Sequence, residues 1–428
     1  MSATRAALTF VMASALVIVL AAPAWARAGD SGPELAVNTY TASSQSEPVV
    51  GIAADGQFVV AWTSAGQDGD RFGVYARRYN AEGTPQGDEF RVNTTTVDRQ
   101  WQPAIGVASD GRFVIAWTSE TQDGDSGGIY ARHFDADGTP KSEELRVNTT
   151  TAGAQRQPAV GMAADGRLVI AWTSTGQDGD GDGVFAQLYD AVGTPIGAEL
   201  RINSTFTGSQ NQPAAGMAED GQFVVAWTGA GQEADDVNNI YDAYNVYARR
   251  FDATGAPVAG EFRANATTTD TQWQPVVGMA PDGRFVVVWT SSGQDGDGDG
   301  VYAQLYDAVG TPHAGEFRVN STTTNWQHQP AVAMAVDGRF VVAWTSKDQD
   351  GAGDGVYART YAANGAPVSQ ETRMNVTMLG HQNGPSIASD REDRLVLTWT
   401  SDSAGTPDIV ARQMSWNGLL SVRPAPVR

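Results

Sequence analysis

Cysteine is absent from this chain of 428 residues. No disulfide can therefore hold the fold together. A protein of this kind must be stabilised by burial of side chains, by closure of the chain on itself, or by bound metal ions.

Residues typical of enzyme centres are also scarce. The sequence has four histidines, none of which recurs between its repeats, and it contains neither a nucleophile elbow nor a His-Glu-x-x-His motif. The phrase Asp-Gly-Arg-Phe-Val-Val-Ala-Trp superficially resembles the Asp-box of sialidases, but the Ser/Thr and Gly placements differ. The sequence therefore predicts no catalytic residue.

Positive charge is scarce as well. The chain has 28 Lys and Arg against 49 Asp and Glu, and its formal net charge is −21. A protein this acidic repels phosphate groups, so we expect neither nucleic acid nor anionic membrane surfaces among its partners. Cations are its natural counter-charge.

The N-terminus carries the pattern of an export signal. An apolar run from Ala6 to Leu20 follows the single charge of Arg5, and Ala24-Trp25-Ala26 provides the small residues of an A-x-A cleavage site. A membrane anchor is the alternative, but the run is short for a membrane span. We expect a signal peptide at 1–26, a short leader at 27–33, and a mature protein that is secreted or displayed at the cell surface without membrane insertion.

The chain is built from one repeat, marked by seven tryptophans. Successive tryptophans are 55 residues apart, with one gap of 62: Trp62, Trp117, Trp172, Trp227, Trp289, Trp344 and Trp399. A fixed period of this length, made of short apolar runs and glycine-rich turns, is typical of a radial repeat architecture. We expect these tryptophans to form the cores of the repeats.

The third repeat shows the expected content of each unit. Its runs near 159–163, 168–172, 184–189 and 199–203 predict four strands, and Asp165-Gly166 predicts a two-residue hairpin turn. No segment has convincing helical periodicity. The sequence therefore predicts an all-β fold, a seven-bladed β-propeller with four antiparallel strands per blade, over residues 34–420, followed by a C-terminal tail at 421–428. Small residues at one place in the first strand predict that this strand is innermost: Gly51, Gly106, Gly161, Gly216, Gly278, Ala333 and Ala388.

The two ends of the chain indicate how the ring closes. Residues 34–38 repeat the phrase of a fourth strand, but no first three strands precede them. The seventh repeat ends near Gly418 without a good copy of that phrase. We therefore predict that the N-terminal strand completes the last blade, whereas an open solenoid would need capping repeats.

An acidic loop follows the second strand of several repeats. Its aspartates alternate with glycines, so a tight turn can point several carboxylates at one hard cation, and without a cation they would repel one another. The loop is not an EF-hand, because its twelfth position is Tyr189 or Tyr306. The alternative is that the first aspartate bonds local backbone in a turn. The predicted calcium ligands are Asp178, Asp180 and Asp182; Asp295, Asp297 and Asp299; and Asp350 with Asp354.

A second recurring segment, of the form Gln-x-Gln-Pro, links each blade to the next and falls on the same face as the acidic loops. Its variable position is often large, which is typical of a recognition position on a rigid rim, although each such side chain could simply pack on the adjacent loop. The fourth repeat adds seven residues within 233–245 on the same face. The candidate ligand-binding residues are Trp101, Arg156, Asn211, Trp273, Trp326, His328, Tyr241 and Tyr244.

The repeat resembles a known family. Residues 293–304, Gly-Gln-Asp-Gly-Asp-Gly-Asp-Gly-Val-Tyr-Ala-Gln, followed by Glu-Phe-Arg-Val-Asn at 316–320, look like a tandem repeat of large secreted bacterial surface proteins of adhesin type. The resemblance covers residues 34 to about 417 and implies export and adhesion-type binding. The acidic loop is also similar to the calcium loops of integrin-type FG-GAP propellers, although the FG and GAP phrases are absent.

Together these features predict an exported, non-enzymatic propeller that binds an extracellular protein, with calcium in its rim loops. One alternative is a lectin that binds a glycan through aromatic residues between blades, and another is a sialidase-like glycoside hydrolase. We expect the protein to be a monomer.

Overall fold

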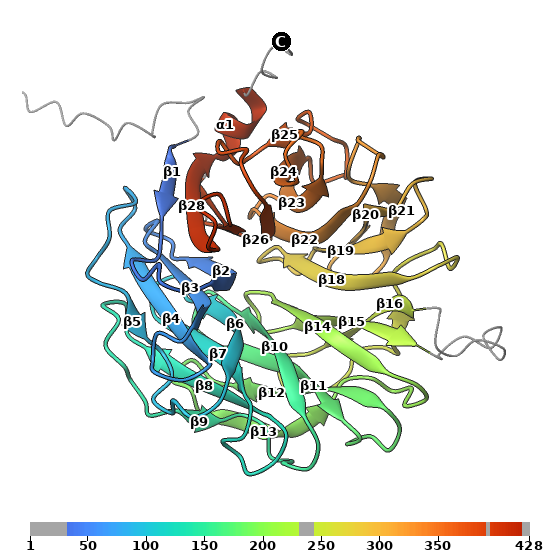
Figure 1. Ribbon diagram of the computed structural model, residues 1–428. Helices are drawn as coiled ribbons and strands as arrows, with labels where there is room; N and C mark the ends of the chain where they lie inside the picture. The colour runs from blue at the N-terminus through green and yellow to red at the C-terminus, as the bar shows by residue number, and fades with distance from the viewer. Residues whose placement is uncertain (1–31, 231–243, 391–393, 422–428) are drawn as a thin grey trace, which may run out of the picture.

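The computed structural model describes residues 32–230, 244–390 and 394–421. These residues form seven four-stranded antiparallel sheets arranged in a ring around a central axis (Figure 1). The predicted seven-bladed β-propeller is thus confirmed. The predicted signal peptide, residues 27–31 of the predicted leader, residues 422–428 and Tyr241 lie outside the described residues. In the described part, no helix is long and apolar enough to cross a membrane.

Each blade contributes four strands in the order inner to outer. The first strands are β2 (Gln45–Ile52), β6 (Gln100–Val107), β10 (Gln155–Met162), β14 (Gln210–Met217), β18 (Gln272–Met279), β22 (Gln327–Met334) and β26 (Gln382–Ser389). The second strands are β3 (Phe58–Ala65), β7 (Phe113–Ser119), β11 (Leu168–Thr175), β15 (Phe223–Ala230), β19 (Phe285–Ser292), β23 (Phe340–Lys347) and β27 (Arg394–Ser401). The third strands are β4 (Phe72–Tyr79), β8 (Gly128–Phe134), β12 (Asp182–Tyr189), β16 (Tyr244–Phe251), β20 (Asp299–Tyr306), β24 (Asp354–Tyr361) and β28 (Asp408–Ser415). The fourth strands are β5 (Phe90–Arg91), β9 (Leu145–Arg146), β13 (Pro195–Arg201), β17 (Phe262–Arg263), β21 (Pro312–Arg318), β25 (Thr372–Arg373) and, for the last blade, β1 (Glu34–Ala36).

The second strands are apolar on both faces because each lies between two neighbouring blades. All seven repeat tryptophans are fully buried, as predicted. Trp172, for example, packs in one cluster with Val114 and Ala116 of the preceding blade and Phe185 of its own. An aromatic side chain of this size buries about 150–250 Å² of surface, so these contacts supply much of the stabilisation between blades.

The first strands approach one another closely around the axis, which explains their small residues. A Cβ atom at Gly51 would lie 2.4 Å from the Cγ2 atom of Val107 in the next blade. A Cβ atom at Gly161 would lie 3.2 Å from the backbone of Gly216. Both distances are tighter than ordinary van der Waals contact, so larger residues would push the blades apart.

The N-terminal strand closes the ring, as predicted. Strand β1 pairs antiparallel with β28, with Glu34 opposite Arg412, and lies beside it in Figure 1. Asn38 accepts the backbone N–H of Ile409 at 2.7 Å. Glu34 accepts the backbone N–H of Val376 at 2.5 Å, so it joins the last blade to the link that follows the sixth blade. An equivalent hydrogen bond from a backbone N–H to a glutamate joins every other neighbouring pair of blades, through Glu89, Glu144, Glu199, Glu261, Glu316 and Glu371.

Two local features differ from the sequence-based expectation. The hairpin turn of the third blade has three residues instead of two, because Ala163 N–H donates to the carbonyl of Arg167 at 2.8 Å and encloses residues 164–166. Gly166, with φ of +95°, supplies the left-handed residue that ends such a turn. A short helix, α1 (Trp416–Ser421), follows β28. It forms without a helical repeat because Trp416 and Leu419 are buried in the core of the last two blades.

Candidate functional site

The propeller has two faces with different contents. The link face carries the acidic loops between second and third strands and the links between blades. The hairpin face carries the turns between first and second strands and between third and fourth strands. A cavity lies at each end of the axis, and the two differ in size and lining.

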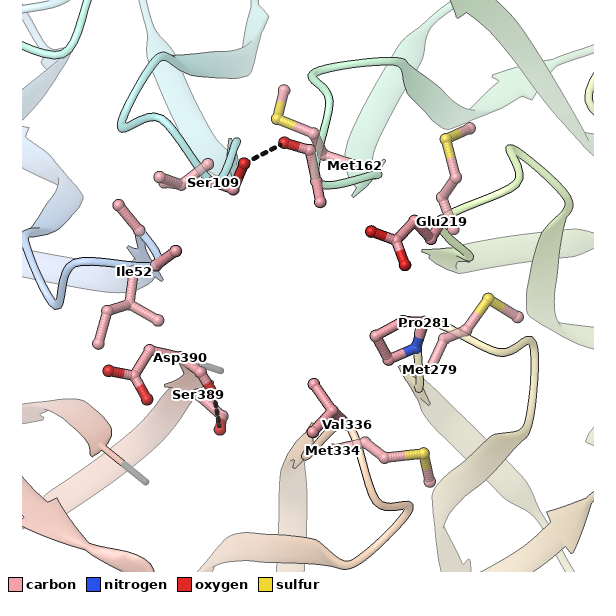
Figure 2. A pocket seen from close by; sticks show the side chains of 15 residues that line it. Ile52, Ser109, Met162, Glu219, Met279, Pro281, Met334, Val336, Ser389 and Asp390 are labelled. Carbon is pink, nitrogen blue, oxygen red and sulfur yellow. Dashed lines mark hydrogen bonds between the residues drawn. The ribbon is translucent and has the colours of Figure 1, made fainter. Parts of the chain in front are cut away.

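The cavity on the hairpin face is small. Its volume is about 170 Å³, below the range of about 300–1,000 Å³ that is typical of small-molecule sites. Figure 2 shows methionine, isoleucine, proline and valine side chains around its opening, with the carboxyl groups of Glu219 and Asp390 on opposite sides. Asp390 accepts the backbone N–H of Arg394 at 2.8 Å and pairs with its guanidinium at 3.5 Å. This carboxylate therefore has a structural role in the last blade.

The cavity on the link face is larger and is built from equivalent residues of all seven blades. Its volume is about 340 Å³, within the range for small-molecule sites. It is lined by the third and fourth residues of each Gln-x-Gln-Pro segment. We call the third residues the axial ring: Glu47, Gln102, Gln157, Gln212, Gln274, Gln329 and Gly384.

The backbone of the axial ring is left-handed. Its six non-glycine members have φ between 52° and 58°, and Gly384 has φ of 61°. In each blade the pairing of the first and second strands shifts register here, as between Arg156 and Ala159 in the third blade. A bulge of this kind re-aims a side chain, and non-glycine residues at positive φ are a recurrent feature of functional sites.

The glutamine side chains of the ring are held by their oxygen atoms. Oε1 of Gln157 accepts the hydroxyl of Thr173 at 3.0 Å and the backbone N–H of Gln212, in the next blade, at 3.3 Å. Because a backbone N–H can only donate, these bonds identify the oxygen of the amide. The Nε2 atoms of all five ring glutamines have no hydrogen-bond partner within the described residues. The five glutamines are half-buried, and their NH₂ groups are left for the cavity.

The ring has one charged member and one gap. Oε2 of Glu47 accepts the hydroxyl of Thr63 at 2.8 Å and the backbone N–H of Gln102 at 3.0 Å. Among the described residues that line this cavity, Glu47 is the only ionisable one. Gly384 leaves open space, because a Cβ atom there would meet nothing within 4 Å. The axial ring therefore lacks a side chain in the seventh blade.

The predicted rim residues lie around the ring but do not converge. Arg156 pairs with Asp182 of its own blade at 2.7 Å. Burial lowers the pKa of His328, while Asp354 and Asp299 oppose the shift. Trp326 is 50% exposed, with Nζ of Lys347 4.2 Å from its ring centre. Trp101, Asn211 and Trp273 are half-buried at the second position of their strands, and Tyr244 is half-buried at the start of β16.

In each acidic loop, the aspartates have separate protein partners. The first accepts a hydrogen bond from the buried asparagine that follows the fourth strand: Asp178 from Asn203 at 2.9 Å, Asp295 from Asn320 and Asp350 from Asn375, both at 3.2 Å. The second accepts a backbone N–H of the following link: Asp180 from Gly208 and Asp297 from Asn325, both at 3.1 Å. These bonds fasten each loop to its own blade and to the next link.

The third carboxylate of each loop turns to a different partner. Asp182 binds Arg156, Asp299 accepts the hydroxyl of Ser292 at 2.6 Å, and Asp354 lies 3.0 Å from Nδ1 of His381. Across residues 32–230, 244–390 and 394–421, no group of three or more His, Cys, Asp or Glu is arranged to hold a metal ion. Calcium binding by these loops stays a prediction.

Sequence reasoning missed the axial ring, although a signal was present. It treated the second glutamine of Gln-x-Gln-Pro as part of a constant frame and assigned recognition to the residue before it. That glutamine precedes proline in five blades, and only Glu47 and Gly384 depart from it. The bulge decides which of the two neighbours faces the axis, and the sequence pattern does not show the bulge.

Comparisons with known proteins support the fold. No protein-family model and no curated protein matches the sequence. A protein of unknown function from Dyadobacter fermentans is similar in structure, with a TM-score of 0.54 and 11% identity over 90% of this chain and 98% of that one. The GH93 α-L-arabinofuranosidase of Fusarium graminearum, in complex with arabinobiose, has a TM-score of 0.52 and 10% identity over 91% and 99%. The polysaccharide lyase Uly1 has a TM-score of 0.51 and 11% identity over 86% and 90%. The propeller fold is thus shared with glycoside hydrolases and lyases.

Proposed function

We propose that this protein is an exported, non-enzymatic binding propeller whose ligand is a carbohydrate bound at the cavity of the link face. The observation that carries this proposal is the lining of that cavity, where unpartnered amide groups alternate with proline rings. A sugar offers hydroxyl oxygens to the amides and C–H groups to the prolines. Polar groups placed among apolar ones are the usual composition of a small-molecule site.

The same lining favours binding over hydrolysis. Glycoside hydrolases of most families need two carboxyl groups that flank the scissile bond. The described lining of this cavity supplies one, Glu47, and Thr63 and Gln102 already bond its Oε2 atom. The arabinofuranosidase complex with arabinobiose supports a sugar as a ligand that this kind of fold accommodates.

A protein ligand is the second candidate, favoured by exposed apolar residues on one link. Val376 and Leu379, between the sixth and seventh blades, are 59% and 70% exposed, and Met378 is 39% exposed. Exposed apolar side chains that cluster in this way are typical of protein interaction sites. This candidate retains the adhesion role that the repeat resemblance implies.

A glycan array tests the proposal. We expect the mature protein to bind at least one neutral glycan, and titration calorimetry with that glycan should give a saturable isotherm. Incubation with the same glycan should release no new reducing ends. A silent array from a correctly folded sample would contradict carbohydrate binding and favour the protein ligand.

We further propose that calcium binds the acidic loops of the third and fifth blades. Support comes from the alternating aspartates and from Oδ1 of Asp178, which is buried and has no hydrogen-bond partner among the described residues. Binding to the folded state at a hundredfold excess over Kd adds about 2.7 kcal/mol of stability. Thermal melting in excess chelator should therefore occur several degrees lower than in millimolar calcium, with sodium chloride at matched ionic strength as control. Superimposable curves would refute the calcium sites.

A further inference from the structure

The axial ring is an array of hydrogen-bond donors with a fixed orientation. A backbone N–H of the next blade donates to Oε1 in four of the five glutamines, so in these four the NH₂ group cannot exchange places with the oxygen. The fifth, Gln274, accepts the hydroxyl of Thr290 at 3.5 Å. The five equivalent positions surround one cavity at the axis. A ligand that satisfies them must present several acceptor oxygens from one compact end, as the terminal unit of an oligosaccharide does.

Glu47 and Gly384 make this array asymmetric. They are neighbours in the ring, since the seventh blade adjoins the first. Glu47 replaces two amide donors with a carboxylate whose Oε1 atom has no partner within the described residues. A bound hydroxyl can donate to that atom, whereas a carboxylate of the ligand would be repelled by it and by the net charge of −21.

We propose that the axial ring binds the terminal unit of a neutral carbohydrate chain and that Glu47 excludes acidic sugars, because its carboxylate accepts a ligand hydroxyl where the other blades offer amide donors. This inference rests on the proposed carbohydrate-binding function and specifies the class of ligand and the residue that selects it. Binding energy comes from the glutamine donors and the proline rings. Glu47 contributes discrimination between ligands of similar shape.

The charge of Glu47 is tested with a matched pair of variants. Glu47→Gln keeps the acceptor oxygen for Thr63 and Gln102 and reproduces the residue of five other blades. Glu82→Gln makes the same change of charge in the exposed turn between β4 and β5. The probes are neutral tetraoses of galactose, arabinose, xylose and glucose, and the tetramer of galacturonic acid. We expect wild type to bind a neutral tetraose and to reject the tetramer of galacturonic acid. Glu47→Gln should bind that tetramer at least about tenfold more tightly than wild type, and Glu82→Gln should not.

The glutamine donors are tested by the reverse change. Gln157→Glu retains an acceptor for Thr173 and Gln212 but removes one NH₂ group, as the first blade does naturally. We expect it to weaken binding of the neutral tetraose by about tenfold or more. Melting curves of all three variants show whether the fold is intact.

These experiments distinguish a failure of the axial-ring proposal from a failure of carbohydrate binding itself. If wild type binds galacturonic acid as tightly as a neutral tetraose, the selective role of Glu47 is overturned. If Glu47→Gln behaves like Glu82→Gln, Glu47 does not select the ligand. If folded Gln157→Glu binds like wild type, carbohydrate binding stands but the ring is not its site. If wild type binds no glycan of any kind, the proposed function itself has failed.

Discussion

A chain that begins after Asn38 should lose most of its stability, because the last blade would lack its outer strand. Val37 is fully buried, and the buried N–H of Ile409 would lose its acceptor on Asn38. The hydrogen bonds that Glu34 accepts from Val376 and Thr377 would also be lost. Burial of one valine contributes about 1.5–3 kcal/mol, and each buried group left without a partner costs about 1–3 kcal/mol. The sum is comparable to the whole stability of an ordinary domain, about 5–15 kcal/mol.

Thermal melting by circular dichroism measures this effect. We expect a chain beginning at residue 39 to melt at least about 10 °C below one beginning at residue 32, or to aggregate through the exposed edge of β28. A synthetic peptide of residues 32–40 should restore stability when added in excess, because it can pair with β28 as β1 does. Equal melting of the two chains would mean that the ring is closed by contacts other than this strand.

The substitution Asn203→Asp is expected to cause the second large loss of folding stability. The side chain of Asn203 is buried; its Oδ1 accepts Val184 N–H at 2.8 Å, and its Nδ2 donates to Asp178, Thr205 and Gln210. The substitution keeps the shape but removes three donated bonds and places a second carboxylate beside Asp178. We expect a loss of about 3–5 kcal/mol at pH 7, which is the range for leaving a buried charge uncompensated.

The pH dependence of this loss identifies its cause. Burial and the neighbouring Asp178 raise the pKa of the introduced carboxyl above its unfolded value, so the folded state binds the proton more tightly. Folding stability of the variant, relative to wild type, is therefore lowest at neutral pH and recovers as pH falls through the raised pKa. Denaturant unfolding at pH 7 and pH 5 measures the difference.

Asn265→Asp in the fourth blade is the matched control. Asn265 has the same burial and the same bond to a third-strand N–H, from Val246 at 2.8 Å. Its Nδ2, however, donates to Asn245 at 2.6 Å, where the third blade has a carboxylate. The control should lose less stability and depend less on pH. Equal losses with equal pH dependence would show that burial, and not the Asp178 carboxylate, dominates.

The fold could be predicted from the sequence because its determinants repeat. Trp172 and its six counterparts are spaced so regularly that the number of blades can be counted, and the small residues of the first strands mark the axis. The misplaced N-terminal phrase at 34–38 similarly predicts ring closure, and the pairing of β1 with β28 confirms it. Helix α1 has no counterpart in the other repeats, and it forms because Trp416 is buried against the sixth and seventh blades.

The candidate site was predictable only in part. The Gln-x-Gln-Pro segments of all seven blades meet at one end of the axis, but Arg156 turns to Asp182, while the next residue, Gln157, lines the cavity. A bulge and a left-handed backbone separate the two, and no residue preference in glutamine signals that conformation. The aspartates of the loops likewise look like one cluster in sequence, yet Asp178 and Asp180 bond to different segments.

By itself the sequence determined the number of blades, the strand that closes them and the residues that fill their cores, because burial and spacing are properties of each repeat alone. Only the tertiary structure decided which residues of the seven repeats meet at the axis and form a cavity there. A cavity of about 340 Å³, with five amide NH₂ groups that have no partner among the described residues, exists because closure brings the same residue of each blade to one axis. Among the described residues of its lining, the single carboxylate, Glu47, and the single glycine, Gly384, are distant in sequence and become neighbours only when the last blade meets the first.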